Sequence, residues 1–157
     1  METLKADVKY LKMKHVKHAI EQKGKCLEIK SEELKVPTKV AMRCLDYRSL
    51  KGEMELFKYC YINDDDKVKV PIMCPNTHIF KYWYNNKWII DVEGEHIKDT
   101  LFANFRKVYL KVNRTQNYDS FDTTRFTENQ KHITDALRDA GYQRKFMIAL
   151  KSLLKEI

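Results

Sequence analysis

The stretch HIFKYWYNNKWIID, residues 78–91, constrains the fold more than any other part of the chain. Residues 79–84 and 87–91 are rich in the aromatic and β-branched residues that favour strands. Between them stands the pair Asn85-Asn86, and asparagine tolerates the left-handed backbone that a two-residue hairpin turn requires. The sequence therefore predicts a β-hairpin here.

A third strand is predicted just before this hairpin. Val68, Val70 and Ile72 alternate there with Lys67, Lys69 and Pro71, and we expect the strand to end at Cys74-Pro75. Alternation with a period of two is typical of a strand with one buried face. We therefore expect a three-stranded antiparallel sheet at about residues 67–91.

The aromatic residues of the hairpin fall on both faces of this sheet. Phe80 and Tyr82 point to one side, whereas Lys81 and Trp83 point to the other. A sheet that is covered by helices on one side needs only one apolar face. The surplus rings either pack in the core, which is the interpretation that we favour, or stay open to a ligand.

Helical periodicity is strongest over residues 95–113, where apolar residues recur three or four positions apart at Ile97, Leu101, Phe105, Val108 and Val112. Shorter patterns predict a helical hairpin that starts at Thr38, a helix from a capping box at Thr127 to Gly141, and a last helix from Tyr142. The predicted fold class is α+β, with a helical N-terminal part, a small three-stranded sheet and C-terminal helices packed on it.

The first 24 residues have a pattern of their own. Lysines surround an apolar stripe that includes Leu4, Val8 and Leu11, and Gly24 ends the pattern. We interpret residues 1–24 as a basic amphipathic helix or arm, and residues 25–157 as a single α+β domain. The stripe is also the candidate surface for a homo-oligomer.

The charge of the chain predicts a polyanionic partner. Lys and Arg total 30 against 22 Asp and Glu, which gives a net charge of +8 and a pI near 9.2. Attraction to phosphate grows with positive charge, so nucleic acid, either DNA or RNA, is the expected partner. The candidate contacts are hairpin residues where lysines and rings interleave, together with cations of the C-terminal helices: Lys81, Trp83, Lys87, Lys98, Arg106, Lys107, Lys111 and Arg144.

Motifs for catalysis or metal binding are weak. Glu28-Ile29-Lys30 matches the Glu-x-Lys of restriction-type nucleases, but the upstream aspartate that such a site needs is available only as Asp7, on a predicted helix. Cys74 and His78 form one close pair, whereas a structural zinc site usually has two. We therefore expect no enzymatic activity, no metal and no cofactor.

Apolar runs are far shorter than the roughly 20 residues that a membrane span needs, and lysines interrupt the start of the chain where a secretory signal would be apolar. The four cysteines show no tight repeat. We expect no membrane association, and a location in the cytoplasm or nucleus of a host cell, or in a virion.

The order of HIFKYWYNNKWIID, IKDTLFANFRKVYLK and YQRKFMIALKSLL, within residues 76–157, resembles the accessory domain that precedes the helicase in primase-helicases of large DNA viruses and phages. It also resembles uncharacterised basic proteins of giant viruses. The phosphate loop of the helicase is absent, so the resemblance implies no ATPase activity. It implies a viral binding module beside replication or transcription.

Together these patterns predict a non-catalytic nucleic-acid-binding protein that contacts phosphates through basic helices. The alternative is a structural or scaffold protein, a virion or assembly component, that acts by protein-protein contact or self-association.

Overall fold

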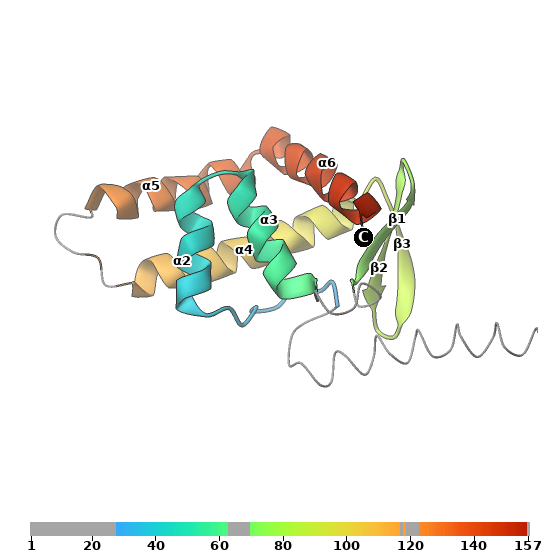
Figure 1. Ribbon diagram of the computed structural model, residues 1–157, viewed down its shortest axis with the longest axis horizontal. Helices are drawn as coiled ribbons and strands as arrows, with labels where there is room; N and C mark the ends of the chain where they lie inside the picture. The colour runs from blue at the N-terminus through green and yellow to red at the C-terminus, as the bar shows by residue number, and fades with distance from the viewer. Residues whose placement is uncertain (1–27, 63–69, 117, 119–122, 157) are drawn as a thin grey trace, which may run out of the picture.

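The computed structural model describes residues 28–62, 70–116, 118 and 123–156 (Figure 1). The predicted arm at residues 1–24 and the predicted strand residues 67–69 lie outside these ranges. Within them, two helices are followed by three strands and then by three further helices, with a short 3-10 turn before the last. The predicted α+β class is confirmed.

Helices α2 (Thr38–Tyr47) and α3 (Leu50–Tyr61) form the predicted helical hairpin. Arg48 ends α2 in the left-handed conformation, with φ at 47°. The two helices are in close contact at Gly52, where a β-carbon would lie 2.1 Å from the Cys44 carbonyl oxygen. A residue without a side chain therefore sets the distance between α2 and α3.

Strands β1 (Ile72–Asn76), β2 (Ile79–Tyr84) and β3 (Lys87–Val92) form an antiparallel sheet in that order. Asn85 and Asn86 have φ angles of 54° and 62°, as the predicted primed turn requires. In the register, Tyr82 stands between Ile72 and Ile89. The predicted sheet is confirmed, with its observed limits at Ile72 and Val92.

Helix α4 (Glu95–Thr115) confirms the strongest helical prediction. Its start is fixed by the buried carboxylate of Asp91, which accepts hydrogen bonds from the backbone N–H groups of His96 at 3.2 Å and Ile97 at 2.8 Å. These donors have no partner within the helix, so the carboxylate both satisfies them and favours the helix dipole. α4 then runs the length of the helical part, and α2 and α3 lie across it (Figure 1).

The ends of the next helices differ from the prediction. Helix α5 (Thr123–Thr134) begins ahead of the predicted capping box, and the Thr127 hydroxyl donates to the Thr123 carbonyl at 2.9 Å inside the helix instead of capping it. Gly141, predicted to end this helix, lies in the first turn of α6 (Ala140–Glu156). The break comes earlier, after the 3-10 turn η3 (Ala136–Arg138), where the Asp139 carboxylate accepts the Tyr142 N–H at 2.8 Å.

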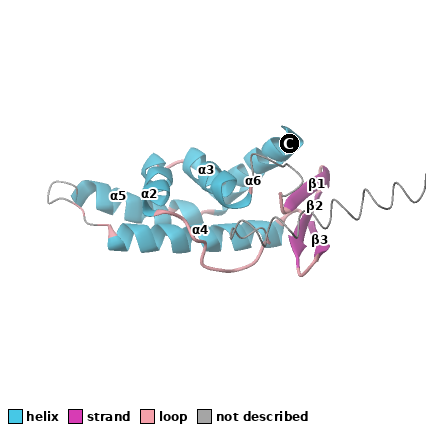
Figure 2. Ribbon diagram, turned by 60° about the horizontal axis from the view of Figure 1, so that its bottom comes forward, coloured by secondary structure: helices cyan, strands magenta, loops and turns pink. Residues whose placement is uncertain are grey.

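One face of the sheet shares its core with the helices. Phe80 and Tyr82 belong to the same buried cluster as Phe102 and Phe105 of α4 and Phe146 of α6. The three phenylalanine rings pack edge to face, with centroids 5.1 to 5.8 Å apart. Figure 2 shows the sheet standing at one end of the helical part.

Residues 28–37, which we call the strap, join the sheet to the helices without regular secondary structure. The Ile29 N–H donates to the Trp83 carbonyl at 3.0 Å. Asn104, fully buried on α4, accepts the Glu32 N–H at 3.1 Å and donates to the Lys30 carbonyl at 2.9 Å. The strap therefore leads from the sheet along the side of α4.

Candidate nucleic-acid interface

The predicted contacts on the hairpin do not form an open stacking surface. Trp83 is 3% exposed and packs edge to face against Trp88, with the ring centroids 5.4 Å apart. Its ring is therefore out of reach of a base in this conformation. Lys81 is half-buried on β2, and Lys87 is exposed beside the turn.

The predicted cations of α4 point in different directions. Helical spacing places Lys107 and Lys111 on one side of α4, and Arg114, which is not among the predicted contacts, follows on that side. Lys98 lies elsewhere on the helix, where its Nζ pairs with Glu95 at 2.8 Å.

Their contacts divide these cations further. Lys107 Nζ donates to Ser31 Oγ at 3.1 Å, and Lys111 Nζ pairs with Glu33 at 2.8 Å, so both face the strap. The hydrogen bond from Lys111, followed by its charge, lowers the pKa of Glu33. This attraction holds the Glu33 side chain ionised beside Lys111.

Arg106 faces the other way, toward α6. Its Nη1 donates to the Leu137 carbonyl at 3.3 Å, and Gln143 donates to the same carbonyl at 2.8 Å. Burial lowers the pKa of Arg106, and the charge of Arg138 lowers it further. Arg144, exposed on α6, follows Gln143 in the chain. The predicted residues therefore fall into separate groups on the hairpin, on the strap side and on the α6 side.

A groove along α2 brings together cations that the sequence analysis did not select. It measures about 830 Å³ and lies between α2, the end of α4 and the start of α5. We call it the α2 groove, and it is lined by Thr38, Lys39, Met42, Arg43, Asp46, Tyr47, Gln116 and Arg125.

Two of its cations have no acidic partner within the described part of the chain. Lys39 and Arg43 are exposed on successive turns of α2, and neither forms an ion pair with another residue of the described ranges. Arg125 is instead held by Asp46, which accepts from its Nε at 3.1 Å and also from its Nη2. With one carboxylate among three cations, the α2 groove attracts anions.

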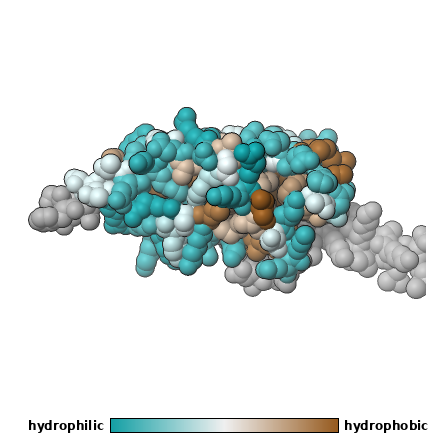
Figure 3. Space-filling model, turned by 90° about the horizontal axis from the view of Figure 1, so that it is seen from above, coloured by the Kyte–Doolittle hydropathy of each residue, from teal (hydrophilic) through white to brown (hydrophobic). Residues whose placement is uncertain are grey.

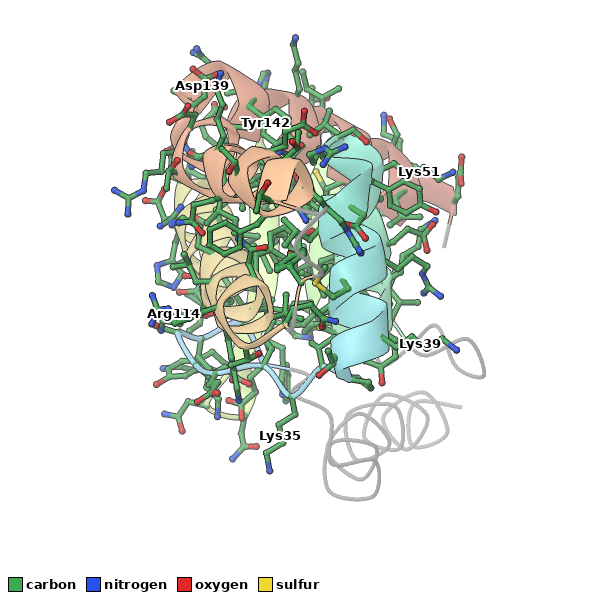
Figure 4. All side chains as sticks on the ribbon, turned by 90° about the vertical axis from the view of Figure 1, so that its left-hand side faces the viewer. Lys35, Lys39, Lys51, Arg114, Asp139 and Tyr142 are labelled. Carbon is green, nitrogen blue, oxygen red and sulfur yellow. The ribbon has the colours of Figure 1, made fainter. Side chains whose placement is uncertain are left out.

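A second hollow adjoins the first. The strap hollow, of about 470 Å³, lies between the strap, α2 and α4, and Lys35 and Lys111 line it. Thr38 lines both hollows, so the two meet at the start of α2. Figure 4 shows Lys35 and Lys39 extending away from the fold on this side of the molecule.

An exposed ring stands at the end of α2. Tyr47 is 40% exposed, and Lys51 Nζ lies 4.8 Å from the centre of its ring. An accessible aromatic ring beside unpaired cations is the combination by which proteins hold single-stranded nucleic acid. Lys39, Arg43 and Tyr47 recur every four residues, so their shared side of α2 could be predicted from the sequence. The groove itself could not, because α4 and α5 supply its other wall.

The most chemically distinctive cluster of the protein is buried. Glu53 of α3 is fully buried, and its carboxylate accepts hydrogen bonds from Tyr109 of α4 at 3.1 Å and from Tyr142 of α6. His132 of α5 lies 3.2 Å away through Nε2. Burial raises the pKa values of Tyr109 and Tyr142, and the charge of Glu53 raises both further. Glu53 lines neither hollow, so this cluster ties four helices together.

The sequence candidates for catalysis or metal binding, Glu28, Cys74 and His78, each contact a different residue. The Glu28 carboxylate accepts the Asn85 N–H at 2.9 Å, Cys74 Sγ donates to the Asn76 carbonyl at 2.9 Å, and His78 stands 3.7 Å from Glu93. Within the described ranges, no three side chains of the His, Cys, Asp and Glu types are grouped so that they could hold a metal ion.

None of the described helices has the length and apolar character that crossing a membrane requires. Comparison with family models, with curated proteins and with solved structures gives no match to this chain. The resemblance of residues 76–157 to accessory domains of primase-helicases therefore stays a prediction.

Proposed function

We propose that this protein is a non-catalytic nucleic-acid-binding protein that holds phosphate groups along the α2 groove and the strap hollow. The observation that carries the proposal is the pair Lys39 and Arg43, which line an open groove and have no acidic partner among the described residues. Because the sequence resembles viral proteins, we further propose that this binding serves viral replication or transcription.

The order of the cations suits a chain of phosphates. Lys111 and Lys35 border the strap hollow, and Lys39 and Arg43 continue past Thr38 along the α2 groove. Residues four apart on a helix have β-carbons about 5–6 Å from one another, so Lys39 and Arg43 can contact neighbouring phosphates. Lys111 must leave Glu33 to do the same, whereas Lys39 and Arg43 have no ion pair with another described residue to break.

The experiment is a titration of fluorescent single- and double-stranded oligonucleotides at several salt concentrations. Each phosphate contact contributes about 0.9 to the slope of log affinity against log salt for a duplex, and about 0.7 for a single strand. We expect the double variant Lys39→Glu/Arg43→Glu to bind more weakly. We also expect the magnitude of its slope to fall by the amount that corresponds to about two phosphate contacts. The control is Lys145→Glu/Lys155→Glu, which changes the net charge equally at exposed positions of α6 outside both hollows.

Two results would contradict the proposal. The first is an absence of binding to both oligonucleotides even at low salt. The second is an equal loss of affinity in the two double variants, because affinity would then follow net charge and not the α2 groove.

A structural or scaffold role by self-association is the second candidate function. The observation that favours it is an apolar area on the sheet, where Met73, Ile90 and Val92 are exposed. Light scattering across a range of protein concentrations tests it, since a scaffold of this kind assembles as concentration rises. A monomer at every concentration eliminates this candidate.

A further inference from the structure

The two faces of the sheet have different surroundings. The inner face carries Phe80 and Tyr82, which belong to the core shared with the helices. The outer face follows from the register, because Lys81 pairs with Met73 and with Ile90, and Trp83 pairs with Trp88. Residues directly opposite one another in an antiparallel sheet lie on the same face.

The outer face carries exposed apolar residues on both sides of Lys81. Ile90 is 63% exposed and Val92 is 62% exposed, and Met73, which is also exposed, lies on the other side of Lys81 from Ile90. None of these residues belongs to the buried cluster that the sheet shares with the described helices. In the space-filling view of Figure 3, hydrophobic atoms gather toward the end of the molecule where the sheet lies, while most of that side is hydrophilic. An apolar area exposed to water is a candidate surface for another element to cover.

The described chain begins at this sheet. The Glu28 carboxylate accepts the Asn85 N–H at 2.9 Å, and the Ile29 N–H donates to the Trp83 carbonyl at 3.0 Å. Both contacts lie at the turn end of β2 and β3, close to Trp83 and Trp88. The described chain therefore starts at one end of the sheet, and 27 residues precede it in the sequence.

We propose that residues 3–22 cover the outer face of the sheet of their own chain as an amphipathic helix. The sequence of this segment places Leu4, Val8, Leu11, Val16, Ala19 and Ile20 close to helical spacing, with lysines between them. A helix of 20 residues spans about 30 Å, and a strand of six residues spans about 20 Å, so the segment is long enough for the whole face. The occupant is this segment because its attachment point lies at the edge of the surface.

The two tryptophans of the chain make this testable in the full-length protein. Both Trp83 and Trp88 lie on the outer face, so intrinsic tryptophan fluorescence reports on this face alone. In Leu11→Asp we expect emission to shift to longer wavelength and acrylamide quenching to increase, because Trp88 becomes more accessible to water. Lys17→Asp is the matched control, since it introduces the same side chain on the side of the helix opposite the apolar residues, and we expect it to leave both signals unchanged.

The remaining outcomes overturn the proposal. Fluorescence of Leu11→Asp identical to that of the unsubstituted protein means that residues 3–22 do not cover the face. A shift that also appears in the unsubstituted protein on dilution, together with dissociation of a dimer by light scattering, means that a second copy covers it. Neither outcome depends on nucleic-acid binding, so this inference and the proposed function succeed or fail separately.

Discussion

Arg125 of α5 and Asp46 of α2 form a two-point ion pair that joins helices far apart in the sequence. Asp46 accepts from Arg125 Nε at 3.1 Å and from Nη2, and it also accepts from Asn129 Nδ2 at 2.9 Å. Partial burial favours the neutral form, but the hydrogen bonds from Arg125 and Asn129 outweigh it and lower the pKa of Asp46. The pair also neutralises one cation of the α2 groove.

Asp46→Asn is therefore expected to lower the stability of the protein while it strengthens oligonucleotide binding. In the unfolded chain an aspartate titrates near 3.9, so a lowered pKa in the folded protein stabilises it above about pH 4, and this contribution is lost as the pH falls further. Because both side chains are partly exposed, we expect a cost of only about 1 kcal/mol at pH 7, which shrinks as the pH falls below about 4. Urea unfolding at pH 7 and at a series of lower pH values measures it.

The same variant is expected to bind oligonucleotides more tightly, because Arg125 loses its carboxylate partner inside the α2 groove. Weaker binding by Asp46→Asn than by the unsubstituted protein would count against the α2 groove as the binding site.

Gly52→Ala is expected to destabilise the protein strongly. Alanine is favoured over glycine in a helix by about 1 kcal/mol. Here its methyl group would lie 2.1 Å from the Cys44 carbonyl oxygen, so α2 and α3 must separate, at a cost of about 3 kcal/mol. Gly141→Ala is the control, because its β-carbon would lie 3.1 Å from a side-chain oxygen of the exposed residue Asp139 and not against the backbone of another helix. Equal melting temperatures for the two variants would contradict this account of the helix crossing.

Glu53→Ala is expected to be the most damaging substitution of a charged residue. It leaves Tyr109, Tyr142 and His132 without their shared acceptor inside the helical part. Removing one partner from a buried charged cluster costs about 3–5 kcal/mol. Denaturant unfolding of Glu53→Ala beside Glu55→Ala measures the difference, since Glu55 lies on the same helix without a hydrogen-bonded partner in the described ranges.

Stability is expected to fall at alkaline pH. Burial raises the pKa of Cys44 to about 11, and it raises the pKa of Tyr142 as well. The unfolded chain therefore loses these protons first, from about pH 9 for cysteine and about pH 10 for tyrosine, and each group lowers the free energy of unfolding by up to about 1.4 kcal/mol per pH unit. Tyr142→Phe is expected to reduce the slope above pH 10, as urea unfolding from pH 8 to 11 would show. An unchanged slope would mean that Tyr142 ionises alike in both states.

Sequence patterns predicted those parts of the fold whose causes are local. The hairpin follows from Asn85-Asn86 and the flanking rings, and α4 follows from its apolar repeat, because turn chemistry and helical periodicity depend on neighbouring residues. The boundary between α5 and α6 was predicted wrongly because Thr127 and Gly141 resemble end signals, whereas Asp139 is the residue that satisfies a helix donor there.

The candidate site was less predictable than the fold. From the sequence alone, Lys98, Arg106 and Lys111 are equally good candidates for phosphate contacts. In the structure, each of them is bonded to a different part of the protein. The value of a cation for binding depends on whether the fold has already given it a partner, which only the tertiary structure reveals. Lys39 and Arg43 stand out once that partnering is known.

The strap carries a consequence for how this chain tolerates insertions and deletions. Asn104 contacts the backbone of Lys30 and Glu32 much as a neighbouring strand would, and Ile29 is tied to Trp83 at the other end. A residue gained or lost between these anchor points would break one set of bonds or the other. This irregular segment should therefore resist changes of length as strictly as a central strand does, unlike an ordinary surface loop.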